Sequence, residues 1–427
     1  MLLAARCVLI VLIVAKHALR ACGSLMIPGR QAKALRRARA GIILARALEQ
    51  LGPTFIKIGQ ILSSRPDLLA PEIAGALARL RDRVEPMPQR HLKHALDVAF
   101  PSRDSVFDFF ELTPVRSASI AQVHRARLRS GINVAVKIRR LGLEKTFKTD
   151  LRIIASAAAL IEKLPRMRST PLRETVEEFG KTLCQQTDFR REAESNRTFR
   201  RNLDDKDVAI PFLVDELCGE SVLVMEYVAG GLNVLAPGFS DATNRLQAGK
   251  LLRVLYQMVF VDGFIHADMH PGNVFFLEDF RVLLLDFGMV AELNDEDLNH
   301  FTEFFLGMVS NDGRRCAGII RKTASWMDPR VPPERFDAMM EEIVARHWLE
   351  LARDYEVARF GVEMFEAQRK CRIRGSTKFA MVILSFIVFE GIARALHPSL
   401  DFQAEARSFI PQVLARRKQK GLLLNAV

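Results

Sequence analysis

The chain has 427 residues, of which 49% are hydrophobic and 26% are charged. These proportions are typical of a globular protein with a sizeable core, and the length suffices for two or three domains or for one two-lobed domain with extensions. The six cysteines are scattered, without a Cys-x-x-Cys pair or zinc-type spacing. This argues against a zinc module or a disulfide framework and favours a reduced, cytosolic setting.

The formal net charge of +12 is concentrated near the N-terminus. No acidic residue precedes Glu49, whereas nine lysines and arginines do. We therefore expect a basic arm that contacts an anionic partner, and not a basic catalytic domain. Nucleic acid is not the expected partner, because the arm has no aromatic side chains on which bases could stack.

An apolar run of nine residues, 7–15, lies within this arm. It is too short to cross a bilayer as a lone helix, which needs about 20 apolar residues. A signal peptide is the rival interpretation, but basic residues follow the run directly and no clean cleavage site is present. We expect an amphipathic or partly inserted anchor, with the basic stretch to Arg46 on an anionic membrane surface. The alternative is a frayed basic terminus without a partner.

The segment 51–67 predicts a helix that begins at Pro53, since proline suits the first turn of a helix. Its apolar residues would pack on most faces of the helix. Lys57 and Gln60, three residues apart, would project together on one face. By itself the pattern indicates a buried helix with two polar residues at its edge. Further helical material is expected over 71–100.

Alternation with period two predicts three antiparallel strands, at 106–112, 119–128 and 133–139. The second strand opens with small side chains, among them Ala118, Ser119 and Ala121. Small residues let a backbone approach phosphate groups, although alanine and serine are less permissive than glycine. The third strand carries Val-Ala-Val-Lys137, a pattern in which a lysine reaches the α- and β-phosphates of ATP. A lysine on a strand is weak evidence when it stands alone.

A carboxylate on a helix beside the sheet would be needed to hold Lys137, and Glu192 is our candidate. The rival interpretation is a solvated surface charge, which is what helix acids usually are. The sequence from Glu226 to Val228 precedes two glycines and resembles a kinase hinge, whose exposed backbone groups would bind adenine. The elements predicted around these residues are helices at 141–164, 172–201 and 242–261 and strands at 208–213 and 220–228.

Two apolar segments then deliver polar residues that suit phosphoryl transfer. The first leads to His-Ala-Asp268-Met-His-Pro-Gly-Asn273, and the second presents Asp286 before Phe-Gly. One carboxylate can take the proton of the acceptor, while an amide and a second carboxylate hold Mg²⁺ against the phosphates. In the kinase pattern, too, an asparagine follows the aspartate by five residues and an Asp-Phe-Gly comes later.

Two other interpretations apply to this region. An Asp-Phe-Gly after an apolar run is, when it stands alone, usually a strand that ends in a turn. On an extended chain, His266, Asp268 and His270 would share one face and form a ligand set suited to Zn²⁺ or a hydrolytic metal. The kinase interpretation is preferred because the upstream parts occur in the expected order.

Residues 295–415 are predicted to be helical throughout. The stretch 379–389 is strongly apolar, but Glu390 and Arg394 interrupt it, so that we expect a buried helix and not a membrane span. The basic tail at 416–420 is expected to be a solvated end.

These motifs together resemble the UbiB/ADCK family of atypical kinases. The resemblance extends over residues 35–400 and rests on Lys57-Ile-Gly-Gln60, the alanine-rich loop, the strand lysine, the His-Pro-Gly-Asn273 loop and Asp286-Phe-Gly. It implies an α+β, bilobal protein kinase-like fold, with a small antiparallel sheet in the N-lobe, a helical C-lobe and an N-terminal helical extension across the active site. It also implies an ATPase or small-molecule kinase-like activity that supports ubiquinone biosynthesis at the cytoplasmic side of a membrane, with quinone precursors and quinone-biosynthesis enzymes as candidate partners.

The resemblance also implies residue roles. Lys137 would contact the ATP phosphates and Glu192 would be its ion-pair partner. Asp268 would be the catalytic carboxylate, and Asn273 and Asp286 would bind Mg²⁺. Lys57 and Gln60 would project over the nucleotide and block protein substrates.

The chain departs from the family pattern at two positions. Gln186 stands where the family usually has glutamate, and a glutamine can hydrogen-bond to Lys57 without neutralising its charge. Met269 replaces the usual proline after the catalytic aspartate, which we expect to loosen the loop. Unlike ordinary kinases, the chain has no His-Arg-Asp arginine and no Ala-Pro-Glu after Asp286, so we do not expect it to phosphorylate proteins in trans.

The predicted domain organisation follows from these assignments: a membrane-contacting segment at 1–30, a helical extension at 31–103, an N-lobe with inserted helices at 104–228, a C-lobe at 229–415 and a basic tail at 416–427. Two alternatives to an ATP-using enzyme stay open here. One is a nucleotide-binding scaffold for quinone-biosynthesis enzymes without useful turnover, and the other is a metal-dependent hydrolase that uses His266, Asp268 and His270.

Overall fold

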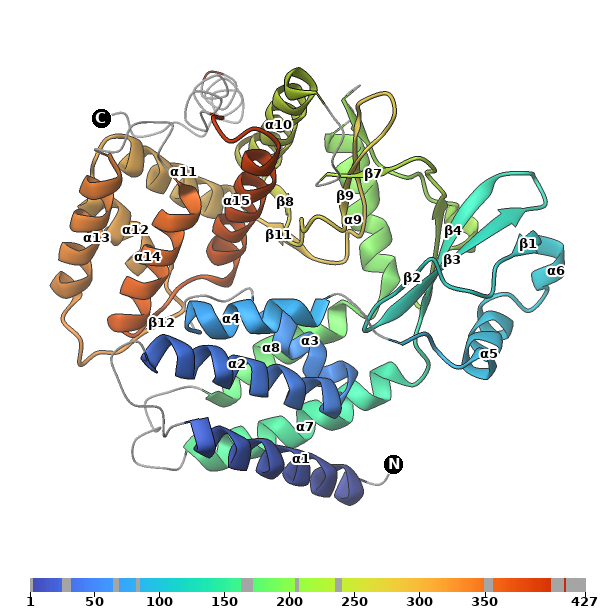
Figure 1. The fold of residues 1–427 in the computed structure, drawn as a ribbon, viewed down its shortest axis with the longest axis horizontal. Helices are drawn as coiled ribbons and strands as arrows, with labels where there is room; N and C mark the ends of the chain where they lie inside the picture. Colours follow the sequence, from blue (N-terminus) through green and yellow to red (C-terminus); the bar gives the residue numbers. More distant parts are fainter. Residues whose placement is uncertain are drawn as a thin grey trace. The chain divides into compact units, whose positions relative to one another are not determined.

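The computed structural model describes residues 3–24, 32–63, 69–81, 85–162, 172–203, 207–234, 240–348, 356–400 and 411 (Figure 1). The basic tail at 416–427 therefore lies outside the described residues, as do Arg65 and Asp67. The chain forms two compact units. Unit 1 comprises Met1–Glu194 and Phe212–Tyr227, and unit 2 comprises Ser195–Pro211 and Val228–Val427.

Unit 1 begins with a group of helices, of which α1, α2 and α4 lie side by side (Figure 1). Their bounds are α1 Leu3–Ser24, α2 Ala32–Leu51, α3 Pro53–Ser63, α4 Pro71–Ala78 and a 3₁₀ turn Arg79–Arg81. The chain turns between α2 and α3 at Gly52, whose φ of 95° is accessible to glycine at no steric cost. The Gly52 amide donates to the Leu48 carbonyl at 3.2 Å and ends α2, and Pro53 then starts α3 as the sequence predicts.

The sheet of unit 1 is antiparallel, with strand order β1-β3-β4-β6 and β2 paired to β3. The bounds are β1 Phe107–Phe110, β2 Arg116–Ser117, β3 Ala121–Leu128, β4 Asn133–Arg139 and β6 Val222–Glu226. The three strands predicted from the period-two pattern are therefore present: the first two are shorter than predicted, and the third has the predicted bounds. One face of the sheet shares a core with helix α5, Gln89–Ala99, and the other shares a core with helix α9, Phe189–Asn202.

The single helix predicted at 172–201 is wrong, because two helices occupy this range. They are α8, Leu172–Gln185, and α9. The break has a local cause: the Thr187 hydroxyl donates to the Cys184 carbonyl at 2.7 Å, and the Asp188 carboxylate accepts from the Arg190 amide at 3.1 Å. An aspartate that accepts amide hydrogen bonds two residues on starts a new helix in place of continuing the old one. Before them, α7 spans Leu143–Glu162, close to the prediction.

Unit 2 contains small sheets and a larger helical part. One sheet has the order β5-β10-β9-β7, and β8 pairs with β11. The strands are β5 Val208–Ala209, β7 Leu232–Asn233, β8 Phe264–His266, β9 Val274–Phe276, β10 Val282–Leu284 and β11 Val290–Glu292. The strand predicted at 208–213 is thus reduced to two residues, with Leu213 forming an isolated bridge to Met225 in unit 1.

The helices of unit 2 pack around one large hydrophobic core. They are α10 Asp241–Tyr256, which continues as a π-helical turn Gln257–Asp262, α11 Asp295–Val309, α12 Gly313–Thr323, α13 Pro333–Trp348, α14 Val357–Lys370 and α15 Thr377–Leu396. The prediction that this region is helical throughout misses the strand pair β12, Trp326–Met327, and β13, Ile373–Arg374. Among the described residues α15 is long and apolar enough to cross a membrane, and 61% of its apolar window is buried in the protein, as expected of a core helix.

Candidate nucleotide-binding and catalytic residues

The strand lysine of unit 1 forms a buried ion pair. The Lys137 Nζ lies 2.6 and 2.8 Å from the two carboxylate oxygens of Glu192, so both oxygens accept from it. Lys137 comes from β4 and Glu192 from the first turn of α9. The ring of Phe189 lies beneath the ammonium group, with its centroid 5.4 Å from Nζ. The pairing predicted from the sequence is therefore present, and it fixes the lysine relative to the helix.

The alanine-rich loop precedes β3 in the same unit. The Ala118 amide donates to the Ala121 carbonyl at 2.8 Å and closes a tight turn. Ser119 and Ala121 are buried, and Ala121 pairs with Arg139 at the end of β4 that follows Lys137. The loop is thus attached to the strand that carries the lysine, two residues beyond it.

Helix α3 carries Lys57 and Gln60, both half-buried. The Gln60 amide donates to the Leu80 carbonyl at 3.1 Å, within the helical extension. Gly59 lies between them at a close helix contact: a Cβ there would come within 2.5 Å of Leu80 Cδ1 and 2.7 Å of Leu48 Cδ1. A larger residue at this position would therefore have to displace the ends of two buried leucine side chains.

The candidate hinge residue Glu226 ends strand β6. Its amide donates to the Phe212 carbonyl at 2.8 Å, and its carboxylate accepts from the Phe212 amide at 3.4 Å. The next amide, that of Tyr227, donates to the Asn133 carbonyl at 3.1 Å. Unit 1 ends at Tyr227 and Val228 begins unit 2, so the chain passes from one compact unit to the other within the predicted hinge.

The catalytic loop candidates lie in unit 2. Asn273 is buried, and its Nδ2 donates to the Asp268 carbonyl at 2.9 Å, which ties the two ends of the His-Pro-Gly loop together. The Leu285 amide donates to the Asn273 carbonyl at 2.9 Å, so the residue before Asp286 is fixed to the same loop. These bonds bring the Asp268–Asn273 loop and the start of the Asp-Phe-Gly segment together.

Asp286 has a φ of 62°, the left-handed region that non-glycine residues seldom adopt. Such a conformation costs free energy and persists where the surroundings enforce it, commonly at functional sites. The following residue supplies the restraint: the buried Phe287 ring packs 5.1 Å from the Phe199 ring and 5.4 Å from the His266 ring, between centroids. The Asp-Phe-Gly segment is therefore held by tertiary contacts and is not an isolated turn at the end of a strand.

His266 is fully buried and both of its ring nitrogens are engaged. Nε2 lies 3.1 Å from the Leu285 carbonyl, and Nδ1 accepts from the Asp268 amide at 3.2 Å. Burial lowers the pKa of His266 below its ordinary value, against the opposing effects of the Leu285 carbonyl and the Asp268 and Asp286 carboxylates. The ring is therefore a neutral structural support.

These contacts argue against the metal-hydrolase interpretation of His266, Asp268 and His270. His266 has no nitrogen left for a metal, and the Nδ1 of His270 accepts from the Gly272 amide at 3.0 Å. Within the part of the chain that the structure describes, no group of three or more His, Cys, Asp or Glu side chains is arranged to hold a metal ion.

Two contributions to these sites were not predicted from the sequence. Phe199 lies on α9 about two turns after Glu192, and its ring packs against Phe264, His266 and Phe287. The second is a buried polar cluster in the extension, where the Asp150 carboxylate accepts from Arg6 at 2.7 and 2.8 Å and from the Thr54 hydroxyl at 2.6 Å. Neither has a local sequence signal, since each depends on residues that are far apart in the chain.

An antiparallel sheet with a lysine held by a helix glutamate, followed by an Asp-x₄-Asn loop and an Asp-Phe-Gly in a helical unit, defines a protein kinase-like domain. Residues 79–320 match the ABC1 atypical kinase-like domain. The chain belongs to this family, as the resemblance to UbiB/ADCK proteins predicts.

Curated relatives cover most of the chain. Proteins named "Probable protein kinase UbiB" from Cronobacter sakazakii and Marinobacter nauticus are each 32% identical to it, over 87% and 88% of this chain and 70% of their own length. Among solved structures, the Rv3197–erythromycin complex from Mycobacterium tuberculosis is similar, with a TM-score of 0.57 and 21% identity over 90% of this chain and 98% of that one. At that identity the similarity concerns the fold.

Proposed function

We propose that the protein binds Mg-ATP and acts as an atypical kinase or ATPase that supports ubiquinone biosynthesis at a membrane surface. The observation that carries the proposal is the buried Lys137–Glu192 pair. A lysine held by both oxygens of a glutamate keeps its charge and points in one direction, which suits a residue that contacts ATP phosphates. The relatives' name, which includes "Probable protein kinase", agrees with this class of chemistry.

The residues of unit 2 fit a magnesium site. Because the Asn273 Nδ2 donates to the Asp268 carbonyl, the amide is oriented with its oxygen as the atom suited to a cation. Asp286 supplies a carboxylate in a restrained conformation. Asn273 and Asp286 would hold Mg²⁺, which neutralises developing charge on the phosphates, and Asp268 would orient the acceptor and take its proton.

The remaining assignments are part of the same proposal. The Ala118–Ala121 loop would approach the phosphates through its backbone, and the chain from Glu226 to Val228 would bind adenine. Lys57 and Gln60 would lie over the nucleotide and exclude protein substrates. The chain lacks the Ala-Pro-Glu that follows the Asp-Phe-Gly of ordinary kinases, so we propose a small acceptor or water as the recipient of the phosphoryl group.

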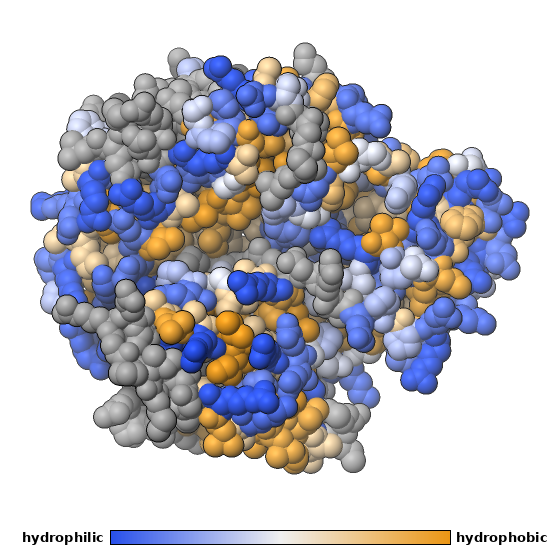
Figure 2. Space-filling model, in the orientation of Figure 1, coloured by the Kyte–Doolittle hydropathy of each residue, from blue (hydrophilic) through white to orange (hydrophobic). Residues whose placement is uncertain are grey.

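Helix α1 supports the membrane part of the proposal. One face buries Arg6 and His17 against the rest of unit 1, while Val8, Leu12 and Leu19 on the opposite face are 58%, 63% and 76% exposed. Figure 2 shows hydrophobic side chains gathered over this helix. A helix with an apolar outward face is unfavourable in water but suits the boundary of a bilayer. The exposed Lys16 and Arg20 on α1, together with the absence of acids before Glu49, suit an anionic surface.

The direct test of the enzymatic proposal is ATP hydrolysis by the full chain in the presence of anionic liposomes. Asp286→Asn should abolish hydrolysis, because the variant loses the carboxylate while asparagine tolerates the left-handed φ. Asp279→Asn, an exposed aspartate on the same hairpin, is the matched control and should retain it. Equal rates for wild type and Asp286→Asn would overturn the proposal.

Four further measurements test the alternatives and the other parts of the proposal. A scaffold that binds but does not turn over ATP would be stabilised thermally by Mg-ATP, and its Asp268→Asn variant would fully complement a quinone-deficient strain. Quinone profiling of a deletion strain rescued with Lys137 or Asp286 variants tests the link to ubiquinone. Flotation with phosphatidylglycerol vesicles tests membrane binding by α1. Leu19→Glu should lose binding to the vesicles, whereas Leu246→Glu, which changes an exposed residue on α10, should retain it.

A further inference from the structure

One arginine, which lies outside the alanine-rich loop in the sequence, forms hydrogen bonds to that loop. Arg140 lies directly after β4, and its amide donates to the Ile120 carbonyl at 2.9 Å. Its guanidinium donates from Nε to the Ala118 carbonyl at 2.9 Å and from Nη2 to the Ser117 hydroxyl at 2.9 Å. The backbone and the side chain of Arg140 therefore bind three of the four positions from Ser117 to Ile120, all except Ser119.

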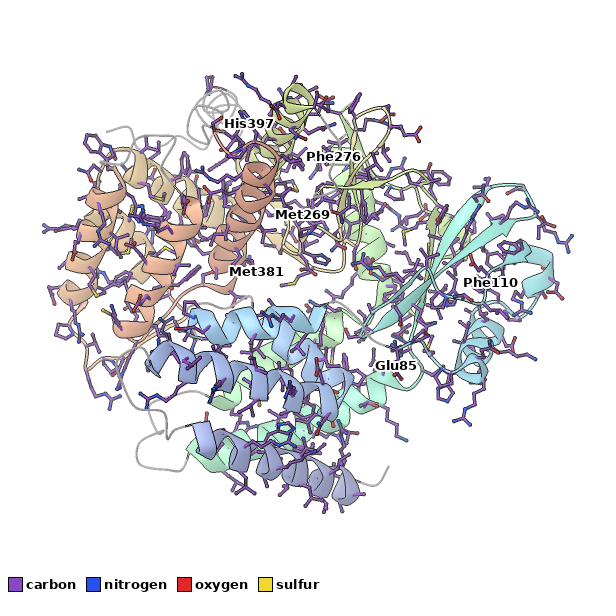
Figure 3. The ribbon with its side chains drawn as sticks, in the orientation of Figure 1. Glu85, Phe110, Met269, Phe276, Met381 and His397 are labelled. Atoms are coloured by element: carbon purple, nitrogen blue, oxygen red, sulfur yellow. The ribbon has the colours of Figure 1, made fainter. Side chains whose placement is uncertain are left out.

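The same guanidinium reaches a second segment of the chain. Nη2 of Arg140 also donates to the Glu85 carbonyl at 2.6 Å (Glu85 is labelled in Figure 3). Glu85 belongs to the sequence Glu-Pro-Met-Pro, which precedes α5 and comes after α3, the helix of Lys57 and Gln60, and after α4 and the 3₁₀ turn. Two prolines in four residues restrict the backbone, so this segment is a stiff connection.

A second contact fixes the segment to the sheet. The Met87 amide donates to the Gln122 side-chain carbonyl, and the Gln122 amide group donates to His124 Nε2 at 3.1 Å. His124 in turn donates from Nδ1 to the Glu111 carbonyl at 2.9 Å. Gln122 and His124 are almost completely buried on β3. The segment from Glu85 to Met87 is thus attached on one side to β3 and on the other to the loop through Arg140.

The charge of Arg140 has no carboxylate partner among the described residues. Its acceptors are two carbonyls and one hydroxyl, all neutral. Burial lowers the pKa of Arg140, but a guanidinium stays protonated in proteins. A half-buried cation that no acid neutralises creates a positive potential at the loop, which favours an anionic ligand there.

We propose that Arg140 is a positioning residue that locks the loop from Ser117 to Ala121 to the segment from Glu85 to Met87 and thereby sets the affinity of the loop for nucleotide phosphates. The inference rests on the proposed function, because it assumes that the loop approaches ATP. A lysine cannot replace Arg140, since it lacks the rigid fork that serves several acceptors at once.

Hydrogen exchange of the full chain without nucleotide tests whether Arg140 holds the loop and the segment from Glu85 to Met87 together. The reporters are the Ala118 and Met87 amides, one on each side of Arg140. In Arg140→Lys both should exchange about tenfold faster, because losing two or three hydrogen bonds costs on the order of 1.4 kcal/mol locally. Ser117→Ala, which removes one acceptor, should have a smaller effect in the same direction. Arg127→Lys, on β3 and paired with Asp108, is the matched control and should change neither amide.

Nucleotide binding tests the consequence. Arg140→Lys should raise the Kd for Mg-ATP about tenfold while leaving the Kd for adenosine unchanged, since adenosine has no phosphates. Unchanged exchange at Ala118 and Met87 would overturn the inference whether or not the protein binds ATP. Altered exchange with an unchanged Mg-ATP affinity would overturn the role in phosphate binding. If the wild type bound neither ligand, the proposed function would fail. The exchange result would still show whether Arg140 holds the loop and the segment from Glu85 to Met87 together.

Discussion

Arg6 on α1 and Asp150 on α7 form a two-point ion pair across 144 residues of sequence, with nitrogen–oxygen distances of 2.7 and 2.8 Å. Asp150 is completely buried and also accepts from the Thr54 hydroxyl at the start of α3. Nη2 of Arg6 donates in addition to the Leu51 carbonyl at 2.7 Å, at the end of α2. One cluster therefore joins the proposed membrane helix to the helix that carries Lys57.

Asp150→Asn should loosen α1, because it leaves the buried Arg6 guanidinium without a countercharge, at a cost of about 3–5 kcal/mol. Limited trypsin digestion would report the change as faster cleavage after Lys16 and Arg20. Thr54→Val removes one hydrogen bond and should have a smaller effect, of about 1 kcal/mol. Equal cleavage in wild type and Asp150→Asn would show that the pair does not hold the helix.

Glu192→Gln should lower the free energy of unfolding by about 3–5 kcal/mol, since Lys137 would stay buried without its carboxylate. The double variant Lys137→Met, Glu192→Leu should lose less than this, because it removes both charges. Urea unfolding measures both. Lys148→Met, which breaks the exposed pair with Glu144, should cause no measurable change. A double variant less stable than Glu192→Gln would contradict the argument.

Gly59→Ala should destabilise unit 1 by about 1–3 kcal/mol, because the added methyl group would overlap Leu80 and Leu48 unless both side chains move. Gly75 is the matched control: it also lies within a helix, and a Cβ there meets no atom within 4 Å. Gly75→Ala should be neutral or stabilising by about 0.5–1 kcal/mol, since alanine favours helix. Thermal unfolding of the two variants checks the difference in sign.

Stability should fall as the pH drops below about 6.5, the ordinary pKa of histidine. Burial lowers the pKa of His124, so the unfolded chain binds a proton at a pH at which the folded protein does not. The unfolded state is then stabilised relative to the folded state as the pH falls, by up to about 1.4 kcal/mol per pH unit for one such group. His124→Asn, which can keep a donor to the Glu111 carbonyl, should flatten this dependence. His91→Asn, exposed on α5, should leave it unchanged.

Phe199→Ala should destabilise unit 2 by about 3–5 kcal/mol, since a fully buried ring that packs on His266 and Phe287 is lost. Hydrogen exchange should also become faster at Leu285, because the restraint on Phe287 and on the strained Asp286 is removed. Phe109→Ala, about half-exposed on β1, should cost much less. An unchanged Leu285 exchange rate would show that the ring does not restrain this segment.

Local signals in the sequence determined the strands and the residue pairing at the lysine. Alternation of apolar and polar residues over 121–128 and 133–139 follows directly from the two faces of a strand, so β3 and β4 could be predicted within a few residues. Lys137 and Glu192 could be paired because a motif specified their order along the chain. The break at Asp188 was missed, although aspartate is a common helix start, because no proline or glycine lies between residues 181 and 201.

The sequence by itself thus determined the kinase-like class and most candidate residues, since these follow from short motifs and from the order of the motifs along the chain. Only the tertiary structure decided which distant groups meet. The contacts of Arg6 with Asp150, of Phe199 with Phe287 and of Arg140 with Glu85 join residues that no local pattern links. It also decided against the metal triplet, because hydrogen bonds from the folded backbone occupy both nitrogens of His266. Hydrogen-bond partners depend on where the chain returns in space, and residue spacing alone does not contain that information.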